Sequence, residues 1–132
     1  MIYTLEWLKD IELDITKPTL IFLYWDLWAG KTTLSQIILQ KILDKKQEIT
    51  SPTYVYYNKY EDNYHFDLYR LSSYDEFVSI AGEEILDNNS WVILLEWPEK
   101  IEDYYQADIE IHIEKTENPE TRNIEIIYKK KA

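Results

Sequence analysis

The feature that most constrains the fold is an apolar run that leads through a short loop into an amphipathic segment. Residues 19–24 form a continuous β-prone run, as expected of a strand buried on both faces. Between residues 32 and 43, apolar side chains recur at helical spacing: Leu34, Ile37, Ile38, Ile42 and Leu43. A buried strand, an eight-residue loop and a helix in this order are typical of α/β proteins.

Further strands are predicted from apolar runs that end at turn residues. The stretches 54–60 and 64–69 flank the polar turn 61–63, and together they predict a hairpin. A second continuous apolar strand is predicted over 91–96, and its last residue is the carboxylate Glu96. The chain therefore contains two strands that are apolar enough to lie in the centre of a sheet.

The last two strands are predicted to close the sheet. The stretches 107–113 and 122–128 alternate apolar and polar residues, as in an antiparallel pair with one solvated face. Short helices are expected over 4–10 and 74–80. We expect turns at 51–52 and 87–90 and a solvated basic tail over 129–131. The sequence thus predicts one α/β domain over residues 1–132, a three-layer arrangement with a mixed sheet.

Composition excludes several classes of function. The chain has no cysteine, so it offers neither a disulfide framework nor a thiolate metal site. No segment resembles a secretion signal or a membrane span, so we expect a soluble protein of the cytoplasm with no membrane partner. The formal net charge of −11 repels phosphodiester backbones, which makes direct binding of free RNA or DNA unfavourable.

The loop between the first buried strand and the first long helix carries a phosphate-binding signature. In the pattern G-x-x-x-x-G-K-[ST], backbone N–H groups and a helix N-terminus surround a phosphate, lysine reaches the outer phosphates, and the hydroxyl binds Mg²⁺. Gly30, Lys31 and Thr32 supply the end of this pattern, and Trp25 occupies its first position. Alone, these three residues also fit a solvated first helical turn; the strand before them and the helix after them favour the phosphate site.

Glu96 strengthens the same interpretation. It ends the second buried strand, where a Walker B carboxylate would reach a magnesium ion. The tryptophans oppose it, because positions that need positive φ or close approach to a phosphate favour glycine. An indole there would cost on the order of 1–3 kcal/mol in strain and would also fill the pocket.

Four motifs together resemble one known family. They are Asp26-Leu27-x-Ala29-Gly30-Lys31-Thr32-Thr33-Leu34, Ser51-Pro52-Thr53-Tyr54, His65-Phe66-Asp67-Leu68-Tyr69-Arg70-Leu71 and Glu96-Trp97-Pro98-Glu99-Lys100. In this order and spacing they are similar to TsaE, a P-loop ATPase of bacterial tRNA threonylcarbamoyladenosine synthesis. The resemblance runs from about residue 20 to 128, and it implies a P-loop NTPase-like fold with ATP and Mg²⁺ as cofactors.

The resemblance also implies roles for individual residues. Lys31 would contact the β- and γ-phosphates, Thr32 and Glu96 would ligate Mg²⁺, and Lys31, Asp67 and Glu96 would be the catalytic residues. The expected nucleotide-binding positions are Trp25, Asp26, Leu27, Trp28, Ala29, Gly30, Lys31, Thr32, Thr33, Thr53 and Trp97.

Plainer alternatives stay open for several of these residues. Thr33 would otherwise pack or cap the helix, and Thr53 would belong to a structural turn. Asp67 either orients a water molecule near the metal or is an exposed residue at the end of a strand. Trp97 either lies beside the nucleotide pocket or is a core aromatic next to Pro98.

Two neighbouring residues of the third motif are not assigned to the site. His65 precedes Asp67 on the same strand and is interpreted as structural rather than as a ligand. Arg70 is a candidate for a phosphate or a partner contact, and in so acidic a chain an internal salt bridge is an equal alternative.

The tryptophans in the loop suggest a change of genetic code. The family's loop reads G-D-L-G-A-G-K-T, so Trp25 and Trp28 both fall on glycine positions. The chain has only two glycines, and some bacteria decode UGA as glycine rather than tryptophan. We therefore hypothesise that residues 25 and 28, and also Trp91, are glycine in the cell. Trp97 belongs to the family motif, and Trp7 is not assigned.

The resemblance gives the functional expectation. An ATP-binding, slowly hydrolysing subunit would act with a TsaB/TsaD-type complex that modifies adenosine 37 of tRNA, so tRNA would be contacted only through partners. If Trp25 and Trp28 are genuine, a decayed interaction module without nucleotide binding is the alternative. A small-molecule kinase is less consistent with 132 residues, which leave little room for a lid.

Overall fold

The computed structural model describes residues 2–4, 15, 17–25, 56–88, 91–118 and 121–129. The described strands form one seven-stranded sheet in the spatial order β1-β7-β6-β2-β5-β4-β3. The strands are β1 (Ile2–Thr4), β2 (Thr19–Trp25), β3 (Tyr57–Tyr60), β4 (Asn63–Asp67), β5 (Val92–Glu96), β6 (Ile109–Lys115) and β7 (Thr121–Tyr128). The helices are α2 (Tyr74–Ser79), α3 (Gly82–Asp87) and the 3₁₀ helix η2 (Pro98–Lys100).

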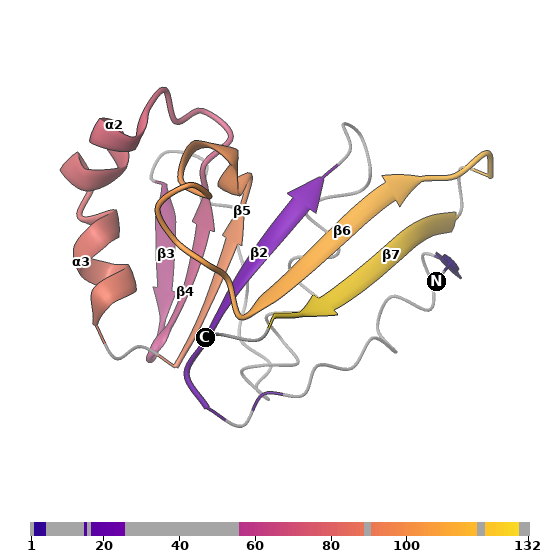
Figure 1. The fold of residues 1–132 in the computed structure, drawn as a ribbon, viewed down its shortest axis with the longest axis horizontal. Coiled ribbons are helices and arrows are strands. Elements are labelled where there is room, and N and C mark those ends of the chain that lie inside the picture. Colours follow the sequence, from indigo (N-terminus) through magenta and orange to yellow (C-terminus); the bar gives the residue numbers. More distant parts are fainter. Residues whose placement is uncertain are drawn as a thin grey trace.

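Parallel strands occupy the centre of the sheet. β2 lies between β5 and β6 and is parallel to both, and β4 is parallel to β5 on its other side. The outer pairs β3–β4, β6–β7 and β1–β7 are antiparallel. The predicted α/β fold with a mixed sheet is confirmed. In Figure 1, α2 and α3 lie at the β3–β4 end of the sheet, and β6 and β7 extend at the other end.

Both faces of the central strands are buried. On one face, Phe22, Phe66 and Leu95 pack with Phe77 of α2 and Ile85 of α3 in one apolar cluster. On the opposite face, a second set of side chains is at most 1% exposed: Ile21, Leu23, Leu94, Ile111 and Ile113. All five residues of β5 are buried, as its unbroken apolar sequence predicts.

The predicted hairpin and closing pair are present with shifted ends. Strand β4 ends at Asp67 rather than at residue 69, and the turn between β3 and β4 consists of Glu61 and Asp62. The closing strands β6 and β7 pair antiparallel along their length. Trp91 lies just outside β5, where its backbone N–H donates to the Asp62 carbonyl at 2.8 Å.

The helix predictions were right in one case and incomplete in others. The helix predicted over 74–80 is α2, and the Ser73 hydroxyl caps it by accepting from the Glu76 N–H at 3.3 Å. The sequence did not predict η2, β1 or α3. The helix predicted over 4–10 is wrong at Thr4, which belongs to β1, and the turn predicted over 87–90 is wrong at Asp87, which ends α3.

Helix α3 begins at one of the two glycines of the chain. A Cβ atom on Gly82 would lie 2.5 Å from two atoms of the Phe77 ring, so no larger residue fits without displacing this ring. Ala81 before it adopts φ 67°, a left-handed conformation that separates α3 from α2. The two short helices therefore pack as a bent pair on the aromatic face of the sheet.

Some predicted elements lie outside the described residues. These are the helix over 32–43, the turn at 51–52, most of the predicted helix over 4–10 and the last two lysines of the tail. Among the helices that the structure describes, none is long and apolar enough to cross a membrane.

Candidate functional site

The candidate site lies at the carboxyl ends of the parallel strands. Asp67 is the last residue of β4 and Glu96 is the last residue of β5, and the two are paired in register. On the other side of β5, Leu23 of β2 pairs with Glu96. Strand β2 then continues to Trp25, where the predicted phosphate loop begins. In open α/β sheets, ligands bind outside this edge of the strands.

Glu96 is a buried carboxylate held by a histidine. Its side chain is 2% exposed, and its Oε2 lies 2.5 Å from Nε2 of His65, which is 3% exposed. An ionised carboxylate only accepts hydrogen bonds, so with Glu96 ionised the donor of this bond is Nε2 of His65. The other ring nitrogen, Nδ1, is buried and has no hydrogen-bond partner within the part of the chain that the structure describes.

Asp67 is more accessible than Glu96. Its side chain is half-buried, and Oδ1 accepts a hydrogen bond from the Tyr69 N–H at 3.1 Å. Its own N–H donates to the carbonyl of Tyr56 at 2.9 Å. The pair therefore combines one enclosed carboxylate with one that faces partly outward, on adjacent strands of one sheet face.

Trp97 turns the chain away from the sheet directly after Glu96. It adopts φ 58° and ψ 60°, and its N–H donates to the Leu23 carbonyl at 3.2 Å. Its ring is half-buried against the core cluster and packs on the Tyr69 ring, with a centroid distance of 5.0 Å. Trp97 is therefore a packed aromatic next to Pro98, and its place beside a nucleotide pocket stays a prediction.

Most predicted nucleotide contacts lie outside the described residues. Of residue 25 the structure describes the backbone, which pairs with Ile113 of β6. The other predicted contacts outside the described part are Asp26, Leu27, Trp28, Ala29, Gly30, Lys31, Thr32, Thr33 and Thr53. Their roles stay predictions. Arg70 is exposed and makes no ion pair with another described residue.

The described residues place two carboxylates at one edge of the sheet. They contain no group of three or more His, Cys, Asp or Glu side chains that could hold a metal ion. Magnesium in nucleotide sites does not need such a group. It is commonly coordinated by one or two protein carboxylates together with the phosphate oxygens of the substrate. Asp67 and Glu96 carry hard oxygen donors at one sheet edge, so their chemistry fits a metal of this kind.

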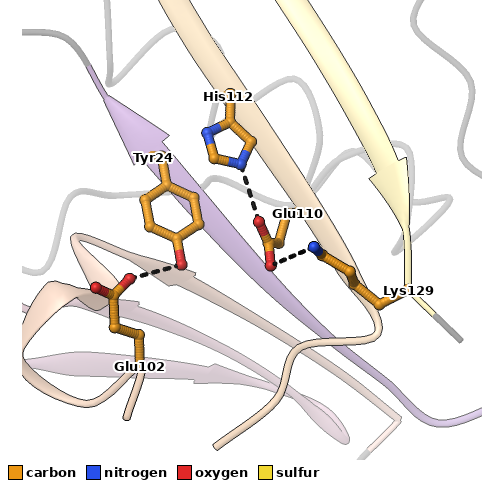
Figure 2. A network of polar contacts seen from close by, with 5 residues as sticks. All are labelled: Tyr24, Glu102, Glu110, His112 and Lys129. Atoms are coloured by element: carbon orange, nitrogen blue, oxygen red, sulfur yellow. Dashed lines mark hydrogen bonds and ion pairs between the residues drawn. The ribbon is translucent and has the colours of Figure 1, made fainter. Parts of the chain in front are cut away.

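A second polar cluster lies on the opposite face of the sheet (Figure 2). The Tyr24 hydroxyl donates to Glu102 at 2.9 Å, and its ring stacks on His112 at 4.4 Å. Glu110 contacts His112 at 3.0 Å and Lys129 at 3.3 Å. Burial, followed by the Glu102 hydrogen bond, raises the pKa of Tyr24 above its usual value. The sequence motifs did not indicate this cluster.

The contact of His65 with Glu96 is the feature that sequence reasoning missed. This contact joins residues 31 positions apart, so no local pattern reveals it. Strand alternation did contain a signal, because residues two apart on a strand share a face. His65 therefore had to lie on the same face as Asp67.

Comparisons with known proteins agree with this arrangement. A family profile described as Threonylcarbamoyl adenosine biosynthesis protein TsaE matches residues 3–124. The tRNA threonylcarbamoyladenosine biosynthesis protein TsaE of Haemophilus influenzae is 35% identical over 122 residues, covering 89% of this chain and 75% of that protein. Its Rickettsia conorii counterpart is also 35% identical, over 83% of this chain and 65% of that protein. The crystal structure of Bacillus subtilis YdiB superimposes with a TM-score of 0.57 at 26% identity, covering 83% of this chain and 68% of that one.

The fold and the site define an α/β protein with a P-loop-like fold and a carboxylate pair at the carboxyl edge of its sheet. The extent of the family match then identifies the group within that class. The chain belongs to the TsaE family.

Proposed function

We propose that this chain is an ATP-binding and slowly ATP-hydrolysing subunit of tRNA threonylcarbamoyladenosine synthesis. It acts in the cytoplasm with a TsaB/TsaD-type complex that modifies adenosine 37. The observation that carries the proposal is the register of the central strands, since Asp67, Glu96 and the start of the predicted phosphate loop share one sheet edge. Membership of the TsaE family supports the pathway.

The proposed residue roles come from the resemblance to the TsaE family, and the shared sheet edge supports them. Lys31 and the backbone of residues 26–33 would hold the phosphates, and Thr32 and Glu96 would hold Mg²⁺. When bound, Mg²⁺ neutralises phosphate charge that would otherwise resist the approach of a nucleophile. Asp67 would accept a hydrogen bond from the attacking water, and its half-buried side chain is compatible with this role.

The charge of the chain supports contact with tRNA through a partner. A net charge of −11 opposes binding of a polyanion, and basic patches are what free RNA binding requires. ATP is also an anion, but a phosphate loop offers it converging N–H groups and a lysine, which compensate locally. The acidic surface therefore suits a subunit that binds nucleotide and docks on a tRNA-binding complex.

Glu96→Gln tests the assigned site against a matched control. The change removes the charge with little change of volume, and we expect ATP turnover to fall at least about tenfold, because even partners of metal ligands contribute 10–100-fold. Glu110→Gln is the control, since Glu110 also contacts a histidine but on the other face. Equal turnover in Glu96→Gln, Lys31→Ala and wild type would refute the site.

One specific observation favours a second function. If Trp25 and Trp28 are the residues present in the cell, their bulk opposes phosphate binding, and the chain would be a docking module without ATP turnover. Calorimetric titration of ATP into the printed sequence and into Trp25→Gly/Trp28→Gly separates the two functions. Binding by the glycine form supports the ATPase; failure of both forms to bind supports the docking module. Mass spectrometry of the native protein shows which residues are present.

A further inference from the structure

The buried pair of His65 and Glu96 is costly for a small domain. Two polar side chains at 3% and 2% exposure have left water, and the described residues give Nδ1 of His65 no hydrogen-bond partner. Apolar residues of similar volume at both positions are often as stable as a buried ionic pair, or more stable. Stability of the fold alone therefore does not explain why these residue types stand here.

The register that brings the pair together is fixed at both ends of the strands. At the start of β5, the Val92 N–H donates to Oδ1 of the buried Asn63 at 3.1 Å, and Asn63 Nδ2 donates to the Tyr60 carbonyl at 3.2 Å. At the other end, the Leu68 N–H donates to the Glu96 carbonyl at 3.1 Å. A slip of one residue would turn His65 to the opposite face, so these bonds hold it against Glu96.

We propose that His65 is a positioning residue that holds the Glu96 carboxylate in the orientation needed for the magnesium–nucleotide complex. This inference rests on the proposed function. His65 itself touches neither nucleotide nor metal and acts only through Glu96. Its hydrogen bond to Oε2 restrains the rotation of the carboxylate, which would otherwise have to be ordered when the ligand binds.

The hydrogen bond from His65 is compatible with a role of the Glu96 carboxylate as a metal ligand. An ionised carboxylate has about four lone-pair positions on its two oxygens, and His65 uses one of them. Carboxylates that ligate metals are commonly held by such neighbours, whose loss costs about 10–100-fold in metal affinity or activity. The expected effect of losing His65 is therefore specific to magnesium, while contacts to ATP made without the metal remain.

The test measures ATP affinity by calorimetry in MgCl₂ and again in EDTA. The protein used carries tryptophan or glycine at positions 25 and 28, whichever binds ATP. In His65→Leu, we expect the gain in affinity that Mg²⁺ provides to fall by about 10–100-fold, with the affinity in EDTA unchanged. His65→Gln should keep most of the gain, because its amide N–H can donate from a place close to that of Nε2. His112→Leu, which alters the other histidine, should keep all of it.

A purely structural role gives a different pattern. The inference is overturned if the ATP affinities with and without Mg²⁺ fall together in His65→Leu and His65→Gln restores neither. It is also overturned if His65→Leu keeps the whole gain in ATP affinity that Mg²⁺ provides. If His65→Leu does not fold, His65→Gln is compared with His65→Asn, whose shorter amide does not reach Oε2. Equal gains in ATP affinity from Mg²⁺ in these two variants also overturn the inference. If neither the printed sequence nor the Trp25→Gly/Trp28→Gly protein binds ATP, the proposed function fails and the inference fails with it. This result differs from the outcomes above, in which ATP binds to the protein that carries His65.

Discussion

The molecule contains two histidine–glutamate pairs on opposite faces of one sheet. His65 and Glu96 are 3% and 2% exposed and lie 2.5 Å apart. His112 and Glu110 are 36% and 20% exposed and lie 3.0 Å apart, with Lys129 at 3.3 Å from the same carboxylate. The side chains are chemically identical in the two pairs, so any difference in their contribution comes from their surroundings.

The surroundings give the pairs different roles. Water can replace either partner of the exposed pair, and salt screens the interaction between them. Such contacts therefore contribute little to the free energy of unfolding. Water cannot replace a partner of the buried pair, so each group depends on the other. A buried pair at the edge where ligands bind is a candidate for function, whereas the partly exposed pair in Figure 2 is a local surface contact.

Replacing one histidine at a time should separate the pairs most strongly. His65→Leu removes the imidazole that contacts a buried carboxylate, and we expect a loss of about 3–5 kcal/mol in the free energy of unfolding. His112→Leu should cost about 0–1 kcal/mol. Urea denaturation measures both, and similar losses in the two variants would contradict the comparison.

The double variant His65→Leu/Glu96→Leu is the control for this prediction. If the cost of His65→Leu comes from an uncompensated charge, removing the charge as well should restore much of the lost stability. A double variant that is less stable than His65→Leu would instead assign the loss to the shape of the site.

Asn63→Ala should have an intermediate effect. The substitution leaves the buried N–H of Val92 without its acceptor and loosens the register that brings His65 to Glu96. We expect a loss of about 1–3 kcal/mol in urea denaturation, the cost of an unsatisfied buried group. Asn58→Ala on the neighbouring strand β3 is a control for shortening an asparagine. A smaller loss for Asn63→Ala than for Asn58→Ala would show that this anchor is unimportant.

Lys129→Gln should have a smaller effect still. It removes the cation from Glu110 in the exposed cluster, and we expect a change of about 0.2–1 kcal/mol. The difference between this variant and wild type should shrink as NaCl is raised, because salt screens exposed charges. A difference that does not depend on salt would mean that this cluster behaves as a buried one.

Tyr24→Phe should change how stability depends on pH in alkali. The pKa of Tyr24 is raised by burial and by Glu102, so the folded protein keeps a proton that the unfolded chain loses near pH 10. The folded state then binds more protons than the unfolded one, and stability falls as the pH rises above about 10. Tyr24→Phe should lessen this fall without abolishing it, because burial also raises the pKa of Tyr105. Unfolding curves across this pH range measure the slope, and an unchanged slope would contradict the assignment.

The sequence predicted those parts of the fold that depend on local patterns. The unbroken apolar run of β5 and the alternation of β6 and β7 gave their strands and pairing, and the carboxylates at the ends of β4 and β5 were found from strand ends and motifs. Helix α3 was missed because it depends on the packing of Gly82 against Phe77. The contact of His65 with Glu96 was missed because the pairing of β4 with β5, rather than either segment alone, creates it.

The most direct test of the account is calorimetric titration of magnesium–ATP into the Trp25→Gly/Trp28→Gly protein and its Lys31→Ala variant. We expect saturable binding to the first protein and binding at least about tenfold weaker in the second, because Lys31 is assigned to the outer phosphates. No binding to the first protein, or equal binding to both, would contradict a nucleotide site at the carboxyl edge of this sheet.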